Sequence, residues 1–303
     1  MDLLKQTKEL CRIYNIKPVR SKGQNFLIKE EFYDKIIETA DLERDETVLE
    51  VGPGLGFLTA KLAKRAKKVI AVELDDKLAN ALGIGLTNQN IGNVEIINNN
   101  ILELGIRNHK SGMEIYNRKD HDSYFIIHDS KYKIVANLPY NITSVFLRKF
   151  LSEIENRPEL MVLMLQKEVA ERITARAGDM SLLAVSVQFY ARPEIIQIVP
   201  KENFWPMPEI DSAIVKIIPH PSDSPLLIRR GEGGEADFFR LVRFGFAARR
   251  KMLKNNLAGG YHIGQSEAEN MITRAGLDPK TRAQDISLDN WLKLFEEVKR
   301  IML

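Results

Sequence analysis

The ten residues TVLEVGPGLG (47–56) join a short apolar run to a glycine-rich turn, and the amphipathic segment FLTAKLAKRA (57–66) follows directly. Glycines at a turn from a strand to a helix let a ligand approach the backbone closely. The spacing is G-x-G-x-G, whereas the dinucleotide fingerprint would need a glycine at Phe57. The loop therefore predicts a ligand site at Gly52 and Gly54 that binds no pyrophosphate, and a tight turn with a purely structural role remains the alternative.

The next apolar run, VIAVE (69–73), ends in Glu73. This residue follows the glycine loop at about the 20-residue interval at which a carboxylate accepts hydrogen bonds from the ribose hydroxyls of a nucleotide. A nucleoside ligand without a diphosphate is therefore expected. S-adenosylmethionine (SAM) fits this description, because it is an adenosine that carries a compact sulfonium and an amino-acid tail.

Short apolar runs alternate with helical segments from Thr47 to about Gln166, which predicts a doubly wound, Rossmann-like α/β domain with a parallel sheet. LLAVSVQFY (182–190) and SAIVKIIP (212–219) are expected to be strands that complete the sheet. The proline-rich segment 200–208 is expected to be an ordered loop. The long polar stretch 104–131 is expected to be a loop, which is either a functional insertion or partly disordered. The runs expected to be the first five strands are TVLEV (47–51), VIAVE (69–73), VEII (94–97), KIVANL (133–138) and LMVLML (160–165).

The chain of 303 residues is long enough for two domains at about 150 residues each. We expect a Rossmann-like domain with an N-terminal basic segment over 1–219 and a small helical domain over 220–303, with a linker after Pro219. In the second part, helices are expected at 267–275, closed by Gly276, and from Leu288, capped by Ser287.

Composition and single residue types exclude several classes of protein. With 44% hydrophobic and 28% charged residues, the chain is neither fibrous nor wholly disordered. The single cysteine, Cys11, excludes an intrachain disulfide, and the five histidines show no ligand spacing, so no metal site is expected. No run of about 18 uncharged apolar residues occurs, and the N-terminus does not resemble a secretory leader. A cytoplasmic protein without a membrane partner is expected.

Two basic clusters stand out from a net charge of only +3. Residues 1–29 carry seven basic and two acidic residues, and residues 238–257 carry six basic and no acidic ones. The second cluster has helical spacing and predicts an amphipathic basic helix. This helix either has an ordinary solvated face or contacts the phosphates of a nucleic acid. Its basic residues are Arg240, Arg243, Arg249, Arg250, Lys251 and Lys254.

The tetrapeptide Asn137-Leu138-Pro139-Tyr140 follows the fourth strand, at the carboxyl end of the sheet, where open α/β folds bind ligands. An exocyclic adenine amine is a poor nucleophile because its lone pair is delocalised into the ring. Acceptors at the Asn137 side chain and the Leu138 carbonyl would hold this nitrogen in line with the sulfonium methyl group. Tyr140 would stack on a flipped base, and Pro139 would stiffen the turn. The alternative is a structural turn with a buried tyrosine.

Phe204 lies in the proline-rich loop, within NFWPMP (203–208). An aromatic side chain held by prolines is suited to clamp the second face or the edge of the target base. The alternative is that Phe204 fills the core.

Seven segments together resemble the ribosomal RNA small-subunit adenine dimethyltransferases, the KsgA/RsmA type. The resemblance covers almost the whole chain. It implies a class I SAM-dependent methyltransferase domain with a small helical domain, and N6,N6-dimethylation of two adjacent adenosines in the 3′-terminal hairpin loop of 16S rRNA in the 30S particle. It further implies a role in ribosome biogenesis and a monomer. The segments are GQNFLI (23–28), VLEVGPGLG (48–56), AVELD (71–75), VANLPYNIT (135–143), MLQKEVAERI (164–173), FWPMPEIDSAIVKIIP (204–219) and FGFAARRKMLKNNL (244–257).

The resemblance also assigns residues to the site. Tyr140 and Phe204 would flank the target adenine. Asn100 stands where the family commonly has an acidic residue that contacts the cofactor adenine; its amide oxygen still accepts a hydrogen bond but carries no charge. The residues that would contact SAM are Asn25, Leu27, Gly52, Gly54, Glu73, Asn100 and Asn137.

Three alternatives stay open at this point. A large-subunit rRNA adenine methyltransferase would usually have N-I-P-Y in place of NLPY. A non-catalytic RNA-binding assembly or transcription factor on the same fold predicts decay of the glycine or NLPY motifs, and both are intact here. A nicotinamide-dependent oxidoreductase is disfavoured by the glycine spacing.

Overall fold

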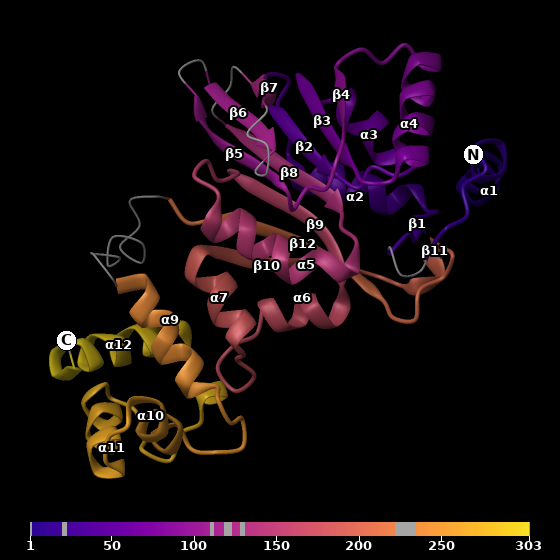
Figure 1. Cartoon of the computed structure of the whole chain (residues 1–303). Helices are drawn as coiled ribbons and strands as arrows, with labels where there is room; N and C mark the ends of the chain where they lie inside the picture. Colours follow the sequence, from indigo (N-terminus) through magenta and orange to yellow (C-terminus); the bar gives the residue numbers. More distant parts are fainter. Residues whose placement is uncertain are drawn as a thin grey trace. The chain divides into compact units, whose positions relative to one another are not determined.

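The computed structural model describes residues 2–19, 23–109, 112–117, 123–127, 131–221 and 234–302. Two compact units are present: one comprises Met1–Ala170 with Pro193–Pro219, and the other Glu171–Arg192 with His220–Leu303. Figure 1 shows the arrangement of elements within each unit. The first unit ends at Pro219, and residues 171–192, which we expected in the first domain, are part of the second unit. The reason is that α7 (Leu182–Tyr190) packs against α9 (Gly234–Gly245), with the Phe189 and Phe238 rings stacked at 4.8 Å between centroids.

A seven-stranded sheet forms the centre of the first unit, in the order β10-β12-β9-β8-β2-β3-β4. The five strands from β9 to β4 are parallel, and β12 joins β9 in antiparallel orientation. The predicted doubly wound α/β architecture is thus confirmed. The strands are β2 (Thr47–Val51), β3 (Lys68–Glu73), β4 (Val94–Asn98), β8 (Tyr132–Asn137), β9 (Leu160–Gln166), β10 (Ala191–Val199) and β12 (Ser212–Pro219).

Helices α2 and α3 pack on the sheet through one buried apolar cluster. Ile36 of α2 and Leu62 of α3 are fully buried there, beside Val48 and Val135 of the central strands. Every residue of β2 is buried, and in β3, β8 and β9 only residues at or next to a strand end are partly exposed, as the apolar runs predict for parallel strands covered on both faces. The helices and short turns of this unit are α1 (Leu3–Ile13), α2 (Glu30–Ala40), α3 (Phe57–Ala63), α4 (Asp76–Asn88), η2 (Tyr140–Ile142), α5 (Thr143–Arg148), η3 (Lys149–Glu153), α6 (Lys167–Ile173, which extends into the second unit) and η4 (Lys201–Asn203).

The segment 182–190 is a helix, α7 (Leu182–Tyr190), so the predicted strand was wrong. Ser181 caps this helix, since its hydroxyl accepts a hydrogen bond from the Ala184 amide at 3.1 Å. A fully apolar run of nine residues does not distinguish a buried helix from a buried strand by periodicity. The outermost strand is instead the next segment, β10, where Pro193 is tolerated because it lies at the edge of the sheet.

The stretch 104–131 is not a plain loop, because its described parts form a separate antiparallel sheet of three strands. The strands are β5 (Leu104–His109), β6 (Gly112–Asn117) and β7 (Ser123–Ile127). Gly105 pairs with Tyr116, and a Cβ atom at Gly105 would lie 2.2 Å from the tyrosine ring. The Arg107 guanidinium stacks over the same ring, at 4.7 Å from its centroid. The intervening residues 110–111, 118–122 and 128–130 lie outside the described part.

The predicted basic helix over 238–257 is two helices, α9 (Gly234–Gly245) and α10 (Leu253–Tyr261), joined by a turn. The buried Asn256 side chain donates to the carbonyls of Gly245, at 2.6 Å, and Ala248, at 3.1 Å, and so holds the turn. A Cβ atom at Gly245 would lie 2.2 Å from the buried Trp291 ring. Helix α9 therefore ends where Gly245 packs closely against Trp291 of α12. The spacing of the basic residues in the sequence did not predict this break.

The two remaining predicted helices are confirmed as α11 (Gln265–Arg274) and α12 (Leu288–Met302). Gly276 follows α11 with a φ of 79°, and the Ser287 hydroxyl accepts from the Asn290 amide at 3.3 Å. Residues 222–233, which contain most of the expected linker, lie outside the described part. None of the described helices is long and apolar enough to cross a membrane.

Candidate cofactor and active site

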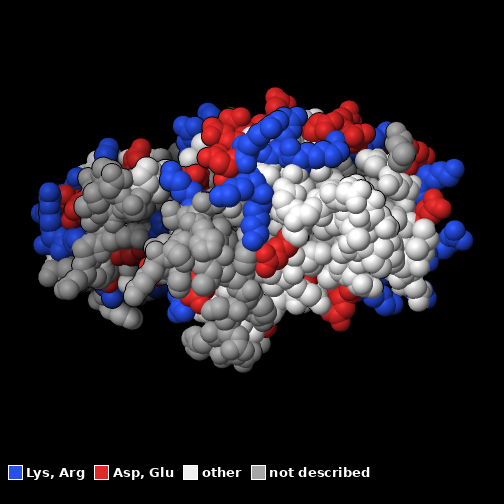
Figure 2. All heavy atoms as spheres, turned by 90° about the horizontal axis from the view of Figure 1, so that it is seen from above, with Lys and Arg blue, Asp and Glu red and all other residues white. Residues whose placement is uncertain are grey.

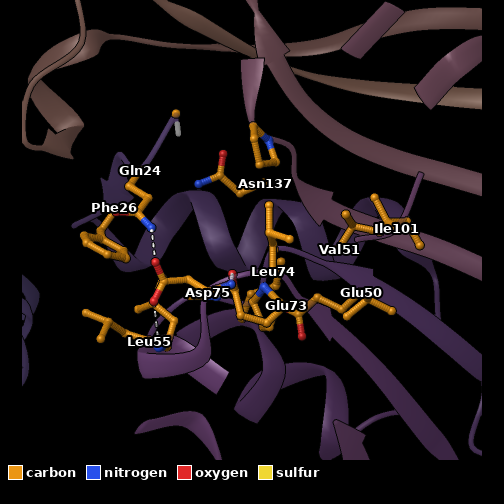
Figure 3. Close-up of a pocket in the computed structure, with 18 of the residues that line it drawn as sticks. Gln24, Phe26, Glu50, Val51, Leu55, Glu73, Leu74, Asp75, Ile101 and Asn137 are labelled. Carbon is orange, nitrogen blue, oxygen red and sulfur yellow. Dashed lines mark hydrogen bonds between the residues drawn. The ribbon is translucent and has the colours of Figure 1, made fainter. Parts of the chain in front are cut away.

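A pocket opens at the carboxyl ends of β2, β3 and β8 in the first unit (Figure 3). The chain builds the sheet outward from β2 in one direction through β3 and β4, and in the other through β8 and β9. Such a switch of direction leaves a crevice between the turns that follow the central strands. The seven residues predicted to contact the cofactor all line this one pocket: Asn25, Leu27, Gly52, Gly54, Glu73, Asn100 and Asn137.

The glycine loop adopts a conformation that suits glycine alone. Gly52 and Gly54 have φ angles of 67° and 58°, and a Cβ atom at Gly54 would lie 3.2 Å from the Phe26 ring. The Gly54 amide donates to Glu73 Oε2 at 3.1 Å, and the Asp75 amide donates to Glu73 Oε1 at 3.0 Å. Each carboxylate oxygen retains a lone pair, so Glu73 can still accept from two hydroxyl groups, as its predicted role requires.

Glu50 is a second carboxylate of this pocket, and the sequence interpretation missed it. Its side chain is 1% exposed, and its Oε2 has no hydrogen-bond partner among the described residues. Burial, together with the neighbouring charge of Glu73, raises the pKa of Glu50 to about 8. A cation that enters the pocket and pairs with Glu50 would favour its ionised form.

Asn137 ends β8 with its side chain over the pocket (Figure 3). Its Nδ2 donates to the Asn25 carbonyl at 3.3 Å. This bond fixes the orientation of the amide and leaves Oδ1 as an acceptor. The predicted function of Asn137 requires an acceptor that faces a substrate amine.

The N-terminal segment closes one side of the pocket through β1 (Phe26–Leu27), which pairs with β11 (Phe204–Trp205). Gln24 lies beside Asp75, with Nε2 at 3.4 Å from Oδ2 (Figure 3). Asp75 also caps α4 by accepting from the Lys77 and Leu78 amides. Residues far apart in the sequence thus form one wall.

A buried lysine supports the turn that carries Asn100. The Lys149 side chain is 2% exposed, and its ammonium donates to the carbonyls of Ile101, at 2.9 Å, and Leu102, at 2.7 Å, and also to that of Leu104. Asn100 Oδ1 accepts from the Leu102 amide at 3.0 Å, which leaves one lone pair for a ligand. Lys149 therefore organises both the pocket wall and the first residue of β5.

Three residues predicted to act on the target base do not line the pocket described by the structure. Leu138 is buried, and its amide donates to the Met164 carbonyl at 3.2 Å. The Tyr140 hydroxyl lies 2.7 Å from Ser212 Oγ. Phe204 is 2% exposed within the core cluster of α2 and α3, as in the alternative interpretation. Pro139, by contrast, lines the pocket.

Besides Glu50, sequence reasoning missed several further pocket residues. Most of them are neighbours of the motif residues, so the only signal was their position beside a glycine or an acidic residue. Lys149 gave no signal at all, because it acts on backbone carbonyls that lie far from it in the sequence. The missed residues that shape the pocket are Gln24, Phe26, Leu55, Leu74, Asp75 and Ile101. The described residues contain no group of three or more potential metal ligands.

The predicted RNA contacts all lie in the second unit, and the structure divides them into two groups. Arg240 pairs with Asp237 at 3.0 Å, and Lys254 pairs with Glu269 at 2.6 Å. The others are exposed: Arg243 on α9, and Arg249, Arg250 and Lys251 on the turn before α10.

The raised pKa of Glu50 leads to a prediction about stability. Between the unfolded pKa of about 4.5 and the folded pKa of about 8, the folded protein keeps a proton that the unfolded chain releases. The free energy of unfolding should therefore fall as the pH rises through this window. Glu50→Gln should remove this fall and be more stable than the wild type at pH 8, as measured by denaturant unfolding at several pH values.

The exposed substitution Glu31→Gln on α2 is the control, and its pH profile should follow that of the wild type. If the Glu50→Gln and wild-type profiles run parallel, Glu50 is ionised in the folded protein near neutral pH.

Lys149→Met should weaken binding of SAM about tenfold and lower the free energy of unfolding by about 1–3 kcal/mol, because it leaves buried carbonyls without a donor. Calorimetric titration with SAM and denaturant unfolding check the two effects. Ile134→Val in β8 should lose about 0.5–1.5 kcal/mol without a change in SAM affinity. Unchanged SAM affinity in Lys149→Met would show that the lysine stabilises the fold only.

Comparison with known proteins identifies the family to which the chain belongs. Residues 17–300 match the family model described as ribosomal RNA adenine dimethylase. "Ribosomal RNA small subunit methyltransferase A" of Dehalococcoides mccartyi is 46% identical over 96% of this chain and 92% of its own length, and that of Pelotomaculum thermopropionicum is 40% identical over 95% and 93%.

Among solved structures, the 23S rRNA methyltransferase ErmE is 27% identical, with a TM-score of 0.69 over 91% of this chain and 100% of that one. The family match spans the glycine loop, the Asn137 turn and the helices of the second unit. The chain therefore belongs to the ribosomal RNA adenine dimethylase family.

Proposed function

We propose that this protein transfers methyl groups from SAM to the N6 atoms of two adjacent adenosines in the 3′-terminal hairpin loop of 16S rRNA in the 30S particle. The observation that carries the proposal is the orientation of Asn137. Its amide nitrogen is bound to the Asn25 carbonyl, so its oxygen is left to accept from a substrate amine at the rim of the pocket.

The pocket fits SAM by the chemistry of its lining. The buried, unpartnered Oε2 of Glu50 suits the ammonium of the amino-acid tail, and the remaining lone pairs of Glu73 suit the two ribose hydroxyls. Leu74 and Ile101 provide apolar surface for the adenine ring, and Asn100 provides a polar contact. When bound, SAM supplies an electrophilic methyl group on a sulfonium.

The residues of the Asn137 turn act on the target base. Asn137 Oδ1 and the Leu138 carbonyl accept from the adenine amine, orient it towards the methyl group and favour the pyramidal nitrogen that attacks. No strong general base is needed before transfer. Tyr140 stacks on the flipped base, with its hydroxyl held by Ser212, and Pro139 stiffens the turn. Phe204 flanks the second face or edge after a rearrangement from its buried position.

The second unit contributes binding of rRNA. Arg243, Arg249, Arg250 and Lys251 are exposed, whereas Arg240 and Lys254 already pair with carboxylates. Exposed cations that replace the counterions of phosphates give affinity without sequence specificity. This division of labour is consistent with a cytoplasmic, monomeric enzyme that recognises an immature small subunit and contributes to its biogenesis.

The other candidate functions receive less support. Relatives at 40–46% identity carry the small-subunit name, whereas the large-subunit enzyme ErmE is 27% identical. A non-catalytic factor would not need the intact pocket, and a nicotinamide enzyme would need a different glycine spacing.

Transfer of radiolabelled methyl groups from SAM to unmethylated 30S particles, followed by primer extension across the 3′-terminal hairpin, tests the proposal. A stop at the paired adenosines is expected. Incorporation of label without this stop would show that a different position is methylated. Tight binding to the particle without incorporation of label would favour the assembly-factor alternative.

Asn137→Ala should abolish methyl transfer and leave the SAM dissociation constant within a few fold, because only the acceptor for the target amine is lost. Single-turnover transfer and calorimetry measure the two effects. Asn88→Ala, exposed near the end of α4, is the control and should keep both. Equal loss of transfer and SAM binding would show that Asn137 mainly holds the cofactor.

Arg249→Glu combined with Arg250→Glu should weaken binding to 30S particles and reduce its salt dependence, with SAM affinity unchanged. Filter binding over a series of salt concentrations checks this. The same charge change at Lys64 and Arg65, at the far end of α3 from the pocket, controls for net charge. Wild-type particle binding by the Arg249/Arg250 variant would leave the turn as an ordinary solvated surface.

A further inference from the structure

The N-terminal basic cluster has no part in the function described so far, and three of its seven basic residues lie on one face of a helix. Lys5, Lys8 and Arg12 lie on α1 at intervals of three and four residues, which places them on the same side of the helix. All three are exposed, and within the described ranges none forms an ion pair with an acidic side chain. Glu9 is the acidic neighbour on this helix.

The opposite face of α1 fixes the helix to the first unit. Thr7 and Cys11 are buried, and Cys11 packs with Ile16, Phe26 and Leu78 in one apolar cluster. Asp2 caps the helix, because its side chain accepts hydrogen bonds from the amides of Leu4 and Lys5. The basic face is therefore held in a defined position and does not belong to a free tail.

This position adjoins one wall of the SAM pocket. Phe26 and Leu78, against which α1 packs, both line the pocket, and Figure 1 shows α1 next to β1 and β11. Lys8 Nζ lies 5.9 Å from the centroid of the Trp205 ring, and Trp205 pairs with Phe26 between β11 and β1. The surface thus combines cations with a partly exposed aromatic side chain, and it adjoins residues that form one wall of the pocket.

Charge on the side of the molecule shown in Figure 2 is mixed. On the side shown in Figure 2, basic and acidic side chains intermingle along one border, and a broad area carries neither kind. With a net charge of +3, attraction of a polyanion must come from local clusters. An enzyme that takes a base out of its stack must also hold the strand that carries the base. Cations close to the pocket suit the phosphates on either side of the target adenosine.

We propose that the surface formed by Lys5, Lys8 and Arg12 of α1, together with Trp205 of β11, binds the RNA backbone next to the adenosine that enters the pocket. This assignment rests on the proposed function. It adds a second RNA contact, separate in sequence from the basic turn of the second unit and part of the same unit as the pocket.

A triple variant, Lys5→Gln with Lys8→Gln and Arg12→Gln, tests the assignment, since glutamine preserves helix propensity. Binding to an RNA that contains the unmethylated 3′-terminal hairpin is measured from low to high salt. Loss of up to three phosphate contacts should reduce the slope of log K against log salt by about 2–3. The KM for this RNA should rise at least tenfold at low salt, while SAM affinity and single-turnover transfer at saturating RNA stay unchanged.

The matched control removes the same charge at Arg44, Lys64 and Arg65, all exposed and away from the carboxyl ends of the strands. This variant should keep the wild-type slope and KM. An equal change in both variants would show that the effect comes from net charge alone and would contradict the assignment. A wild-type salt slope in the α1 variant would also overturn it. Reduced binding to an acidic protein but not to RNA would assign the face to a protein partner instead. Methylation of the same RNA by the wild-type protein is measured in parallel. This measurement tests the proposed function independently of the binding results.

Discussion

The hydrogen bond between the Gly54 amide and the Glu73 carboxylate joins the ends of two neighbouring parallel strands, and the arrangement of the site depends on it. It forms because β2 and β3 pair in a register that brings Val51 beside Val72, so the turn after one strand meets the last residue of the other. The positive φ angles of the glycine loop expose its backbone to the pocket. Phe26 and Pro139 then approach glycines that have no side chains to exclude them.

Several further contacts bring distant segments to the same place. Asn137 is bound to Asn25, Gln24 lies beside Asp75, and Lys149 holds the turn that carries Asn100. Most of these contacts use a backbone carbonyl or amide as one partner. The pocket is therefore preorganised by side chains that satisfy the backbone polar groups of loops, and buried backbone groups of this kind must be paired.

The two buried carboxylates of the pocket differ in how they are satisfied. Glu73 receives two backbone amides, whereas Glu50 keeps an unpartnered oxygen and a pKa raised to about 8 by burial. Such an unsatisfied group costs stability in the free protein. A positively charged ligand that pairs with this oxygen would favour the ionised form of Glu50 and lower its pKa.

The amino-acid sequence determined the doubly wound sheet, the glycine loop, the roles expected of Glu73 and Asn137, and the family, because unbroken apolar runs and closely spaced motif residues are local signals. Only the tertiary structure decided what depends on partners far along the chain. Residues 182–190 are a helix because Ser181 caps them and the second unit buries them, and the basic segment breaks at Gly245 because Trp291 packs there. Glu50 and Lys149 are ordinary charged residues in the sequence. Their importance comes from burial and from backbone partners that no spacing rule encodes.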